Sequence, residues 1–311
     1  MKHDILITGP MYPPTLAELE QTYNAQRLWT APDKDALVAS MADKITAVAS
    51  SNSGGINGAT MAKLPKLKTI AHFGVGYDTV DVEGARARGI SVTNTPDVLT
   101  DEVADLAIAL MLAAVRKVPQ GDRYVRDGKW SKGAMALTES VQGKTVGIVG
   151  MGRIGRAIAK RAAAFGVKLA YQGPNKKSDL AWDYYKDPVD LAKASDIVIV
   201  ACPGGEATKG LVSRAVIEAI GPKGTLVNIA RGSVVDEPAL IEALQSGKLG
   251  HAGLDVFVDE PRVPDAFMAM ENVVLQPHVA SATHQTRKAM GQLVIDNLAA
   301  HFAGKPLVTP V

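Results

Sequence analysis

Short apolar runs alternate with longer segments of helical periodicity along the chain. This alternation is typical of parallel sheets that carry helices on both faces, so the pattern predicts an α/β fold. In the first third, strands are expected at residues 5–8, 47–50, 69–71 and 90–94, with helices around 15–23, 34–41 and 81–88.

The remainder of the chain repeats this pattern around a second sheet. An apolar helix is expected at 101–116, and a polar, glycine-rich stretch at 121–143 follows it. A last helix at 286–302 can return to the first sheet, which leaves a cleft between two doubly wound domains. The second sheet is predicted to have six strands, at 146–149, 167–171, 197–201, 225–229, 253–256 and 273–275.

A GxGxxG motif, formed by Gly150, Gly152 and Gly155, lies between the first strand of the second sheet and a helical segment. Such glycines allow a tight turn and a close approach to a pyrophosphate, while the helix N-terminus attracts the anion. The motif predicts a dinucleotide-binding Rossmann domain over residues 99–284. Residues 1–98 plus 285–311 would then form a discontinuous, flavodoxin-like substrate domain.

The end of the next strand indicates which dinucleotide is bound. An acid that binds the ribose of NAD is expected about 20 residues after the motif, but the chain has Gln172 there. Asn175, Lys176 and Lys177 follow and would suit a 2′-phosphate. NADP(H) is therefore preferred and NAD(H) remains possible; the alternative is that the lysines belong to a solvated loop.

Chemically distinctive residues follow the later strands of the second sheet. Cys202, Arg231 and His278 come after three of its strands, and Asp255 lies at the end of another. Ligands of doubly wound sheets collect outside these carboxyl ends. We expect Cys202 to line the cofactor site, because no base is paired with it as a nucleophile would require.

Several motifs, in this order, resemble the D-isomer-specific 2-hydroxyacid dehydrogenases, and most closely their glyoxylate/hydroxypyruvate reductase branch. They are residues 74–78 (GVGYD), 100–105 (TDEVAD), the GxGxxG, 228–232 (NIARG), 253–257 (GLDVF), 259–261 (DEP) and 276–283 (QPHVASAT). The resemblance implies that His278 is the acid/base, Glu260 its partner and Arg231 the substrate-binding arginine. It also implies that Asp255 holds the nicotinamide carboxamide.

Further binding residues follow in part from the same resemblance and in part from the polar residues of the loops. The backbone amides of Val75 and Gly76 would bind the substrate carboxylate, and Ser53, Arg231 and His278 complete the expected substrate set. The expected cofactor set is Gly150, Gly152, Arg153, Ile154, Gly155, Gly173, Asn175, Lys176, Lys177, Cys202, Pro203, Thr208, Ile229, Ala230, Arg231, Asp255, His278 and Ser281.

The chemistry of keto-acid reduction gives independent reasons for the three catalytic residues. Hydride addition to the carbonyl carbon requires a proton donor within reach of the carbonyl oxygen, and an imidazolium such as that of His278 can supply it. A carboxylate such as that of Glu260 stabilises the imidazolium. The planar guanidinium of Arg231 suits a carboxylate, and its charge polarises the carbonyl.

Composition limits the classes of partner. The 311 residues carry a net charge of +2 and have no long basic run, which argues against nucleic acid or a membrane surface as the main partner. No apolar run is long enough to cross a bilayer. The single cysteine, Cys202, favours a reducing cytoplasm, and no metal site is predicted because no histidine has a spaced set of partner ligands.

Substrate size and assembly stay open at this stage. Small polar residues favour glyoxylate or hydroxypyruvate, but residues 127–137 either cover a cleft, and so admit hydroxyphenylpyruvate or 2-ketogluconate, or form a dimer arm. The apolar helix at 106–115 must be buried in the chain or in a partner, so a homodimer is expected.

A nucleotide-sensing regulator and an NAD-linked formate or phosphite oxidiser are the alternative functions. His284 is expected at a helix entry.

Overall fold

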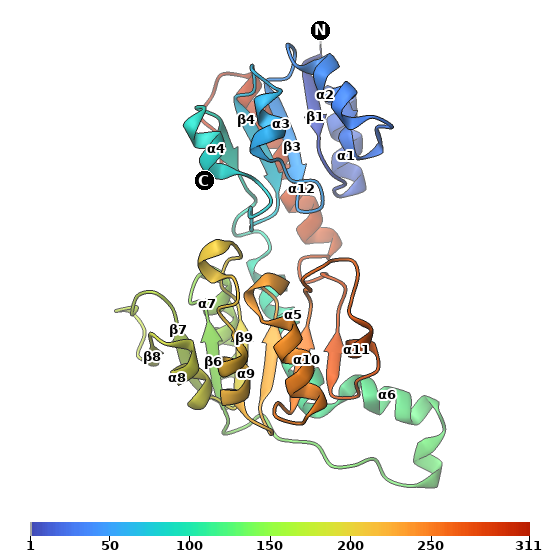
Figure 1. Ribbon diagram of the computed structural model, residues 1–311, viewed down its shortest axis with the longest axis vertical. Coiled ribbons are helices and arrows are strands. Elements are labelled where there is room, and N and C mark those ends of the chain that lie inside the picture. The colour runs from blue at the N-terminus through green and yellow to red at the C-terminus, as the bar shows by residue number, and fades with distance from the viewer. Residues whose placement is uncertain (1) are drawn as a thin grey trace. The chain divides into compact units, whose positions relative to one another are not determined.

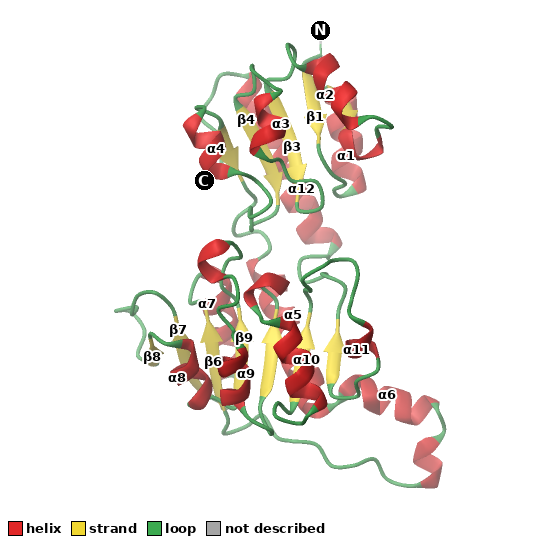
Figure 2. Cartoon of the chain, in the orientation of Figure 1, coloured by secondary structure: helices red, strands yellow, loops and turns green. Residues whose placement is uncertain are grey.

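The computed structural model describes residues 2–311 and divides them into two compact units. The first unit contains the residues up to Leu99 together with Ala282–Val311, and the second contains Thr100–Ser281. Each unit has one sheet in which every strand pairing is parallel, and Figures 1 and 2 show helices on both faces of each sheet. The α/β fold with two Rossmann-like domains, as predicted, is thus confirmed.

The sheet of the first unit has five strands in the order β2-β1-β3-β4-β5, which is the flavodoxin-like order. Its edge strand β2 was not predicted, because its sequence Asn-Ala-Gln-Arg is polar and it pairs only with β1. The strands are β1 (Asp4–Ile7), β2 (Asn24–Arg27), β3 (Ala47–Ser51), β4 (Thr69–Phe73) and β5 (Ser91–Thr93).

Helices bury apolar residues against both faces of this sheet. Helix α12 contacts β3, β4 and α1, so the end of the chain completes the first unit. It begins at His284, directly after its N-cap Thr283, where a helix-entry residue was expected. The helices are α1 (Pro13–Thr22), α2 (Lys34–Met41), α3 (Gly58–Ala62), α4 (Val82–Ala87), α12 (His284–Phe302) and the 3₁₀ turn η1 (Leu28–Thr30).

The sheet of the second unit has seven strands, in the order β12-β11-β10-β9-β6-β7-β8, so the prediction of six was wrong. The strand that was missed, β8, has only three residues and pairs only with β7 at the sheet edge. The order reverses between β6 and β9, which makes that position the topological switch point. The strands are β6 (Thr145–Val149), β7 (Lys168–Gln172), β8 (Asp183–Tyr185), β9 (Ile197–Val200), β10 (Thr225–Asn228), β11 (His251–Leu254) and β12 (Val273–Leu275).

Helix α5, the apolar helix of the sequence, is buried largely inside the second unit. It packs against α7 and strands β10, β11 and β12, and residues such as Leu110 and Met111 are fully or almost fully buried. Burial within the chain therefore removes the argument that this helix requires a partner subunit. The remaining helices are α7 (Arg153–Ala163), α8 (Pro188–Lys193), α9 (Arg214–Ile220), α10 (Glu237–Gln245) and α11 (Asp265–Met268), with α5 at Thr100–Arg116. The short 3₁₀ turns are η3 (Glu206–Thr208) and η4 (Gly232–Val234).

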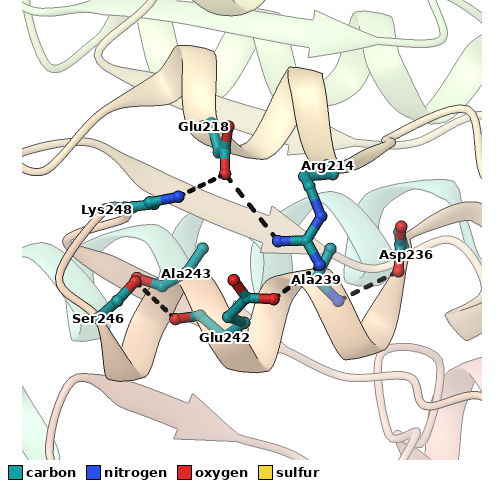
Figure 3. Close-up of polar contacts among 8 residues, drawn as sticks. All are labelled: Arg214, Glu218, Asp236, Ala239, Glu242, Ala243, Ser246 and Lys248. Atoms are coloured by element: carbon teal, nitrogen blue, oxygen red, sulfur yellow. Dashed lines mark hydrogen bonds and ion pairs between the residues drawn. The ribbon is translucent and has the colours of Figure 1, made fainter.

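Helices α9 and α10 are joined by ion pairs beside the strand that leads to Arg231. Arg214 of α9 lies 2.7 Å from Glu242 of α10, and Lys248, just after α10, lies 2.9 Å from Glu218 of α9; Figure 3 draws both pairs. Asp236 caps α10 by accepting a hydrogen bond from the Ala239 N–H at 3.1 Å. Because the ion pairs are exposed, each contributes at most about 1 kcal/mol, so apolar packing provides most of the stability.

An arm formed by α6 (Val118–Arg126) and η2 (Lys129–Lys132) extends from the second unit (Figure 1). No helix was predicted here. The arm exposes apolar side chains: Val125 is 55% exposed, Trp130 69% and Leu137, just beyond it, 98%. Their burial against another surface would be favourable. No helix among residues 2–311 has the length and hydropathy needed to cross a membrane.

Candidate active site

His278 and Glu260 form an ion pair outside the carboxyl ends of β11 and β12. The Nδ1 atom of His278 lies 2.6 Å from Oε2 of Glu260, and the two side chains are 31% and 33% exposed. The Phe257 N–H donates to Oε1 of the same carboxylate at 3.0 Å. Since Glu260 is held at both oxygens, it fixes the imidazole through Nδ1 and leaves Nε2 available for a ligand.

Glu260 is held in its charged form. Burial by itself raises the pKa of Glu260, but the hydrogen bonds from His278 and Phe257 and the charges of His278 and Arg231 outweigh burial, so this pKa lies below its ordinary value. The effect of Arg231 on this carboxyl also places the guanidinium in the same electrostatic environment. The three predicted catalytic residues therefore come together within the second unit.

Asp255 organises the loop that carries His278. Its side chain is fully buried, and its two carboxylate oxygens accept the N–H groups of Val279 at 2.8 Å and Ala280 at 3.0 Å. Its backbone carbonyl accepts the His278 N–H at 2.8 Å, and His278 adopts the left-handed region with φ 53°. Burial raises the pKa of Asp255, against the two backbone hydrogen bonds that lower it. Asp255 thus imposes an unusual backbone conformation on the acid/base residue.

Asn228 and Gly232 shape the turn that presents Arg231. The buried Asn228 side chain accepts the Ala230 N–H at 3.0 Å and donates to the Arg231 carbonyl at 2.9 Å. A Cβ atom at Gly232 would lie 2.0 Å from the Phe257 carbonyl carbon, so only glycine lets this turn pack against the loop that leads to Glu260. Asn228 was not assigned a role from the sequence, although a buried amide at a strand end is a usable signal.

The three glycines of the GxGxxG motif occupy different structural environments. Gly150 has φ 96°, and a Cβ there would lie 2.6 Å from the Cys202 backbone, while one at Gly155 would lie 2.1 Å from the Gly150 carbonyl oxygen. Space around Gly152, the N-cap of α7, is open within 4 Å of an added Cβ. The motif therefore packs the end of β6 closely against the residue that follows β9, at the switch point. It also leaves the backbone at the helix N-terminus accessible. This arrangement fits the pyrophosphate of a dinucleotide.

The loop after β7 is fixed by two tyrosines. The Tyr171 hydroxyl accepts the Lys177 N–H at 2.8 Å, and the Tyr184 hydroxyl donates to the Gly173 carbonyl at 3.0 Å. Tyr184 comes from β8, the strand missed in the sequence. Lys176 is exposed on this loop, so its ammonium group is accessible to solvent.

Cys202 and Thr208 belong to the loop that follows β9. Burial raises the pKa of the Cys202 thiol to about 11, so the thiol stays protonated and does not act as a nucleophile near neutral pH. The Thr208 hydroxyl donates to the Pro203 carbonyl at 2.6 Å and closes the loop. Of the other expected cofactor residues, Ile229 and Ala230 are buried beyond β10, while Arg153 and Ile154 begin α7. Asn175 is exposed after β7, and Ser281 ends the second unit.

The predicted carboxylate-binding loop lies in the first unit, after β4. Its carbonyls are all engaged: that of Gly74 accepts the Thr95 N–H at 2.9 Å, that of Val75 accepts Asn94 Nδ2 at 3.0 Å, and that of Gly76 faces His72 Nε2 at 3.0 Å. Among residues 2–311, no protein acceptor takes the N–H of Val75 or Gly76. These two amides are therefore available to an anion. Ser53 lies after β3, with its hydroxyl 3.3 Å from that of Ser51.

His72 holds this loop in place through hydrogen bonds, a role that was not predicted from the sequence. It is fully buried, its Nδ1 lies 2.9 Å from the Ser50 hydroxyl, and its Nε2 lies 3.0 Å from both Gly76 O and Asn52 Oδ1. Because the Gly76 carbonyl can only accept, Nε2 must carry the proton and donate. The signal available in the sequence was a histidine within an otherwise apolar strand.

Comparison with known proteins places this chain in a family. A family model described as "D-isomer specific 2-hydroxyacid dehydrogenase, NAD binding domain" matches residues 108–280. Glyoxylate/hydroxypyruvate reductase A of Arabidopsis thaliana is 50% identical over 99% of this chain and 98% of its own. Hydroxyphenylpyruvate reductase of Plectranthus scutellarioides is 48% identical over the same shares.

A solved structure agrees with these relatives. The NADPH-dependent glyoxylate/hydroxypyruvate reductase of Sinorhizobium meliloti, in complex with NADP and malonate, has a TM-score of 0.92 and 45% identity, covering 100% of this chain and 97% of that one. Fold and site define a nicotinamide-dependent oxidoreductase with two domains. The chain belongs to the D-isomer-specific 2-hydroxyacid dehydrogenases, which confirms the resemblance predicted from its motifs.

Proposed function

We propose that this dehydrogenase reduces a small 2-keto acid, glyoxylate or hydroxypyruvate, to the D-2-hydroxy acid, with NADPH as the hydride donor. The observation that carries the proposal is the 2.6 Å pair of His278 and Glu260, beside Arg231. The names of the Arabidopsis and Sinorhizobium relatives support the same substrates.

Different residues of the chain have different roles in the proposed reduction. A reduced nicotinamide, when bound, would supply the hydride that the carbonyl carbon of the keto acid accepts. His278 donates the proton from Nε2 to the carbonyl oxygen, while Glu260 stabilises the imidazolium through Nδ1. Arg231 binds and polarises the carbonyl and carboxylate, and the free amides of Val75 and Gly76 bind the carboxylate.

The residues of the second unit fit a nicotinamide dinucleotide. The open backbone at Gly152 and the N-terminus of α7 would hold the pyrophosphate. Asp255 keeps lone pairs beyond the two that accept backbone N–H groups, and these would take the carboxamide. Gly173, Asn175, Lys176 and Lys177 would surround the ribose and its 2′-phosphate.

Steady-state turnover tests the proposal. Purified protein is assayed with each reduced nicotinamide against glyoxylate, hydroxypyruvate, hydroxyphenylpyruvate and 2-ketogluconate, with His278→Gln as the inactive control and His284→Gln as the matched control. We expect NADPH consumption with the two small acids, lost in His278→Gln and kept in His284→Gln. A clear preference for hydroxyphenylpyruvate, the substrate in the name of the Plectranthus relative, would replace the proposed substrate class. Nucleotide binding without any turnover would favour the sensing regulator.

The NADPH preference depends on the loop after β7. Gln172 stands where NAD-binding domains carry an acid, and the exposed Lys176 supplies positive charge. Replacing Lys176 and Lys177 by alanine should weaken NADPH binding roughly tenfold and leave NADH binding almost unchanged, because exposed ion pairs contribute up to about 1 kcal/mol each. Lys160→Ala, which removes a similar exposed charge from α7, is the control. Equal losses for the two nucleotides would contradict a 2′-phosphate contact.

A homodimer formed through the α6–η2 arm is part of the proposal. Val125, Trp130 and Leu137 are exposed apolar side chains that a second copy would bury. Sedimentation analysis should show a dimer that Trp130→Asp together with Leu137→Ser dissociates; a monomeric wild-type protein would refute it. The single buried thiol of Cys202 supports a reducing, cytoplasmic location.

A further inference from the structure

Asn94 and Thr95 hold the two peptide groups whose N–H groups bind the substrate carboxylate in the proposed reaction. They directly follow β5, and the carboxylate-binding loop directly follows β4, its neighbour in the sheet. The Thr95 N–H donates to the Gly74 carbonyl at 2.9 Å, and Asn94 Nδ2 donates to the Val75 carbonyl at 3.0 Å. In a trans peptide, as both of these are, the C=O and the following N–H point in opposite directions. The two bonds therefore turn the N–H groups of Val75 and Gly76 away from Asn94 and Thr95.

The contact made by Asn94 depends on its side chain, whereas that of Thr95 does not. A backbone N–H donor is supplied by every residue except proline, but the bond to the Val75 carbonyl needs the side-chain amide of Asn94. This bond is partly buried, so water does not freely replace it. The orientation of the Gly76 N–H therefore depends on which residue occupies position 94.

Thr309, in the segment after α12, holds the backbone of Asn94 at both of its polar groups. The Thr309 hydroxyl donates to the Asn94 carbonyl at 2.6 Å, and the Thr309 carbonyl accepts the Asn94 N–H at 3.3 Å. The next residue, Pro310, forms an antiparallel bridge with Thr93 of β5. The segment after α12 thus fixes the position from which Asn94 reaches the carboxylate-binding loop.

Asn297 of α12 holds Thr309 in turn. Asn297 is 1% exposed, and its Oδ1 accepts the N–H groups of Val308 at 2.9 Å and Thr309 at 3.2 Å. Its Nδ2 donates to the Thr309 hydroxyl oxygen at 2.9 Å, which leaves the hydroxyl hydrogen for the Asn94 carbonyl. A continuous series of hydrogen bonds therefore runs from the buried amide of α12, through Thr309 and Asn94, to the carbonyl of Val75.

We propose that Asn94 and Thr309 are positioning residues for the substrate carboxylate. Asn94 keeps the peptide between Val75 and Gly76 in the orientation that presents its N–H to the carboxylate, and Thr309 keeps Asn94 in place. The inference rests on the proposed function and deepens it, because it assigns part of the substrate affinity to residues that act through a backbone carbonyl. All of these residues belong to the first unit, whereas the proton donor His278 belongs to the second.

Substitutions at the two positions separate the loss of a hydrogen bond from the loss of shape. Asn94→Leu removes the amide donor at similar volume. Thr309→Val removes the hydroxyl at nearly constant shape, and Thr309→Ser keeps it. Thr46→Val is the matched control, because the Thr46 hydroxyl also bonds to a residue of α12, His301, with its Nε2 at 3.2 Å. Thr46 directly precedes β3, so it lies at the opposite edge of this parallel sheet from the carboxylate-binding loop.

For each variant, kcat and KM for glyoxylate, KM for NADPH and unfolding in urea are measured. The glyoxylate KM should rise roughly tenfold in Asn94→Leu, which corresponds to about 1.4 kcal/mol, because the Gly76 N–H loses its alignment. It should rise roughly threefold in Thr309→Val, within the range of one neutral hydrogen bond. Thr309→Ser and Thr46→Val should keep the wild-type KM. In every variant kcat, its pH dependence and the KM for NADPH should stay at the wild-type values.

Unfolding in urea shows which variants are folded, and if Asn94→Leu is not, the two Thr309 variants decide. A wild-type glyoxylate KM in a folded Asn94→Leu or Thr309→Val variant would overturn this proposal alone. So would an equal rise in Thr309→Ser, because the hydroxyl would then not be the responsible group, or a lower kcat with KM unchanged. A wild-type protein that reduces no keto acid would overturn the proposed function and this inference together.

Discussion

The sharpest test of the catalytic site is Glu260→Gln, read through the dependence of kcat/KM on pH. Reduction requires a proton on the donor that faces the carbonyl oxygen, so kcat/KM should fall at high pH, where the proton donor is depleted. The pKa of Glu260 lies below its ordinary value, so the carboxyl is ionised at neutral pH and stabilises the imidazolium. Removing its charge should move the falling limb to lower pH.

The size of this shift follows from the contact. A hydrogen bond between charged partners contributes about 1.5–3 kcal/mol and a neutral one about 0.5–1.5 kcal/mol. Glutamine can still accept the Phe257 N–H at Oε1, so the local fold is preserved. With both side chains about a third exposed, we take the lower end of the difference, about 1 kcal/mol, which corresponds to a displacement of about 0.7 pH unit.

The assay is the initial rate of NADPH oxidation with glyoxylate at subsaturating concentration across the neutral and alkaline range. Glu83→Gln is the control, because Glu83 is 84% exposed and pairs only with Arg86 on the surface. The control should reproduce the wild-type curve. If Glu260→Gln lowers the rate equally at every pH and leaves the limb in place, the carboxylate has no role in sustaining the imidazolium.

Four further outcomes are expected. Arg231→Ala should lower kcat/KM for glyoxylate by roughly 10–100-fold, mainly through KM, since a charged hydrogen bond is worth about 1.5–3 kcal/mol; an unchanged KM would contradict substrate binding by Arg231. His72→Phe should raise KM for glyoxylate, and His72→Gln, which keeps a donor toward Gly76, should restore much of the loss; no rescue would mean a purely packing role. Asp255→Asn should lower the free energy of unfolding in urea by about 1–3 kcal/mol, because an amide donor would then face a backbone donor; an unchanged value would exclude that clash. Cys202 should resist alkylation in the native protein at pH 8, where about one thiol in a thousand is ionised; rapid native labelling would show an accessible thiolate.

Local sequence patterns were sufficient to predict the central strands of both sheets. Buried strands such as β9, whose residues Ile-Val-Ile-Val are all buried, are visible as continuous apolar runs. The edge strands β5 and β12 still carry buried valines and were predicted, whereas β2 and β8 have no fully buried residue and do not give this signal. The polar β2 and the three-residue β8 were therefore missed, and with β8 the tyrosine that fixes the cofactor loop.

The catalytic residues could be predicted because their chemistry is rare at strand ends, whereas their supports could not. Arg231, Glu260 and His278 belong to recognisable motifs, but Asn228 and His72 act through hydrogen bonds to backbone atoms three and four residues further along the chain. Such bonds depend on the conformation of the turn after each strand, which the sequence pattern does not specify. A buried polar residue in an apolar strand was the only local signal.

The contacts within each unit divide the expected effects of mutation into two kinds. In the second unit, Glu260 and Asp255 act on His278, so changes there should alter kcat and its pH dependence. In the first unit, His72 acts on the carboxylate loop, so changes there should alter KM. Because His72 and the His278–Glu260 pair belong to different units, a His72 variant should keep the wild-type pH limb. A shift of that limb in a His72 variant would mean that binding of the carboxylate and proton transfer are coupled.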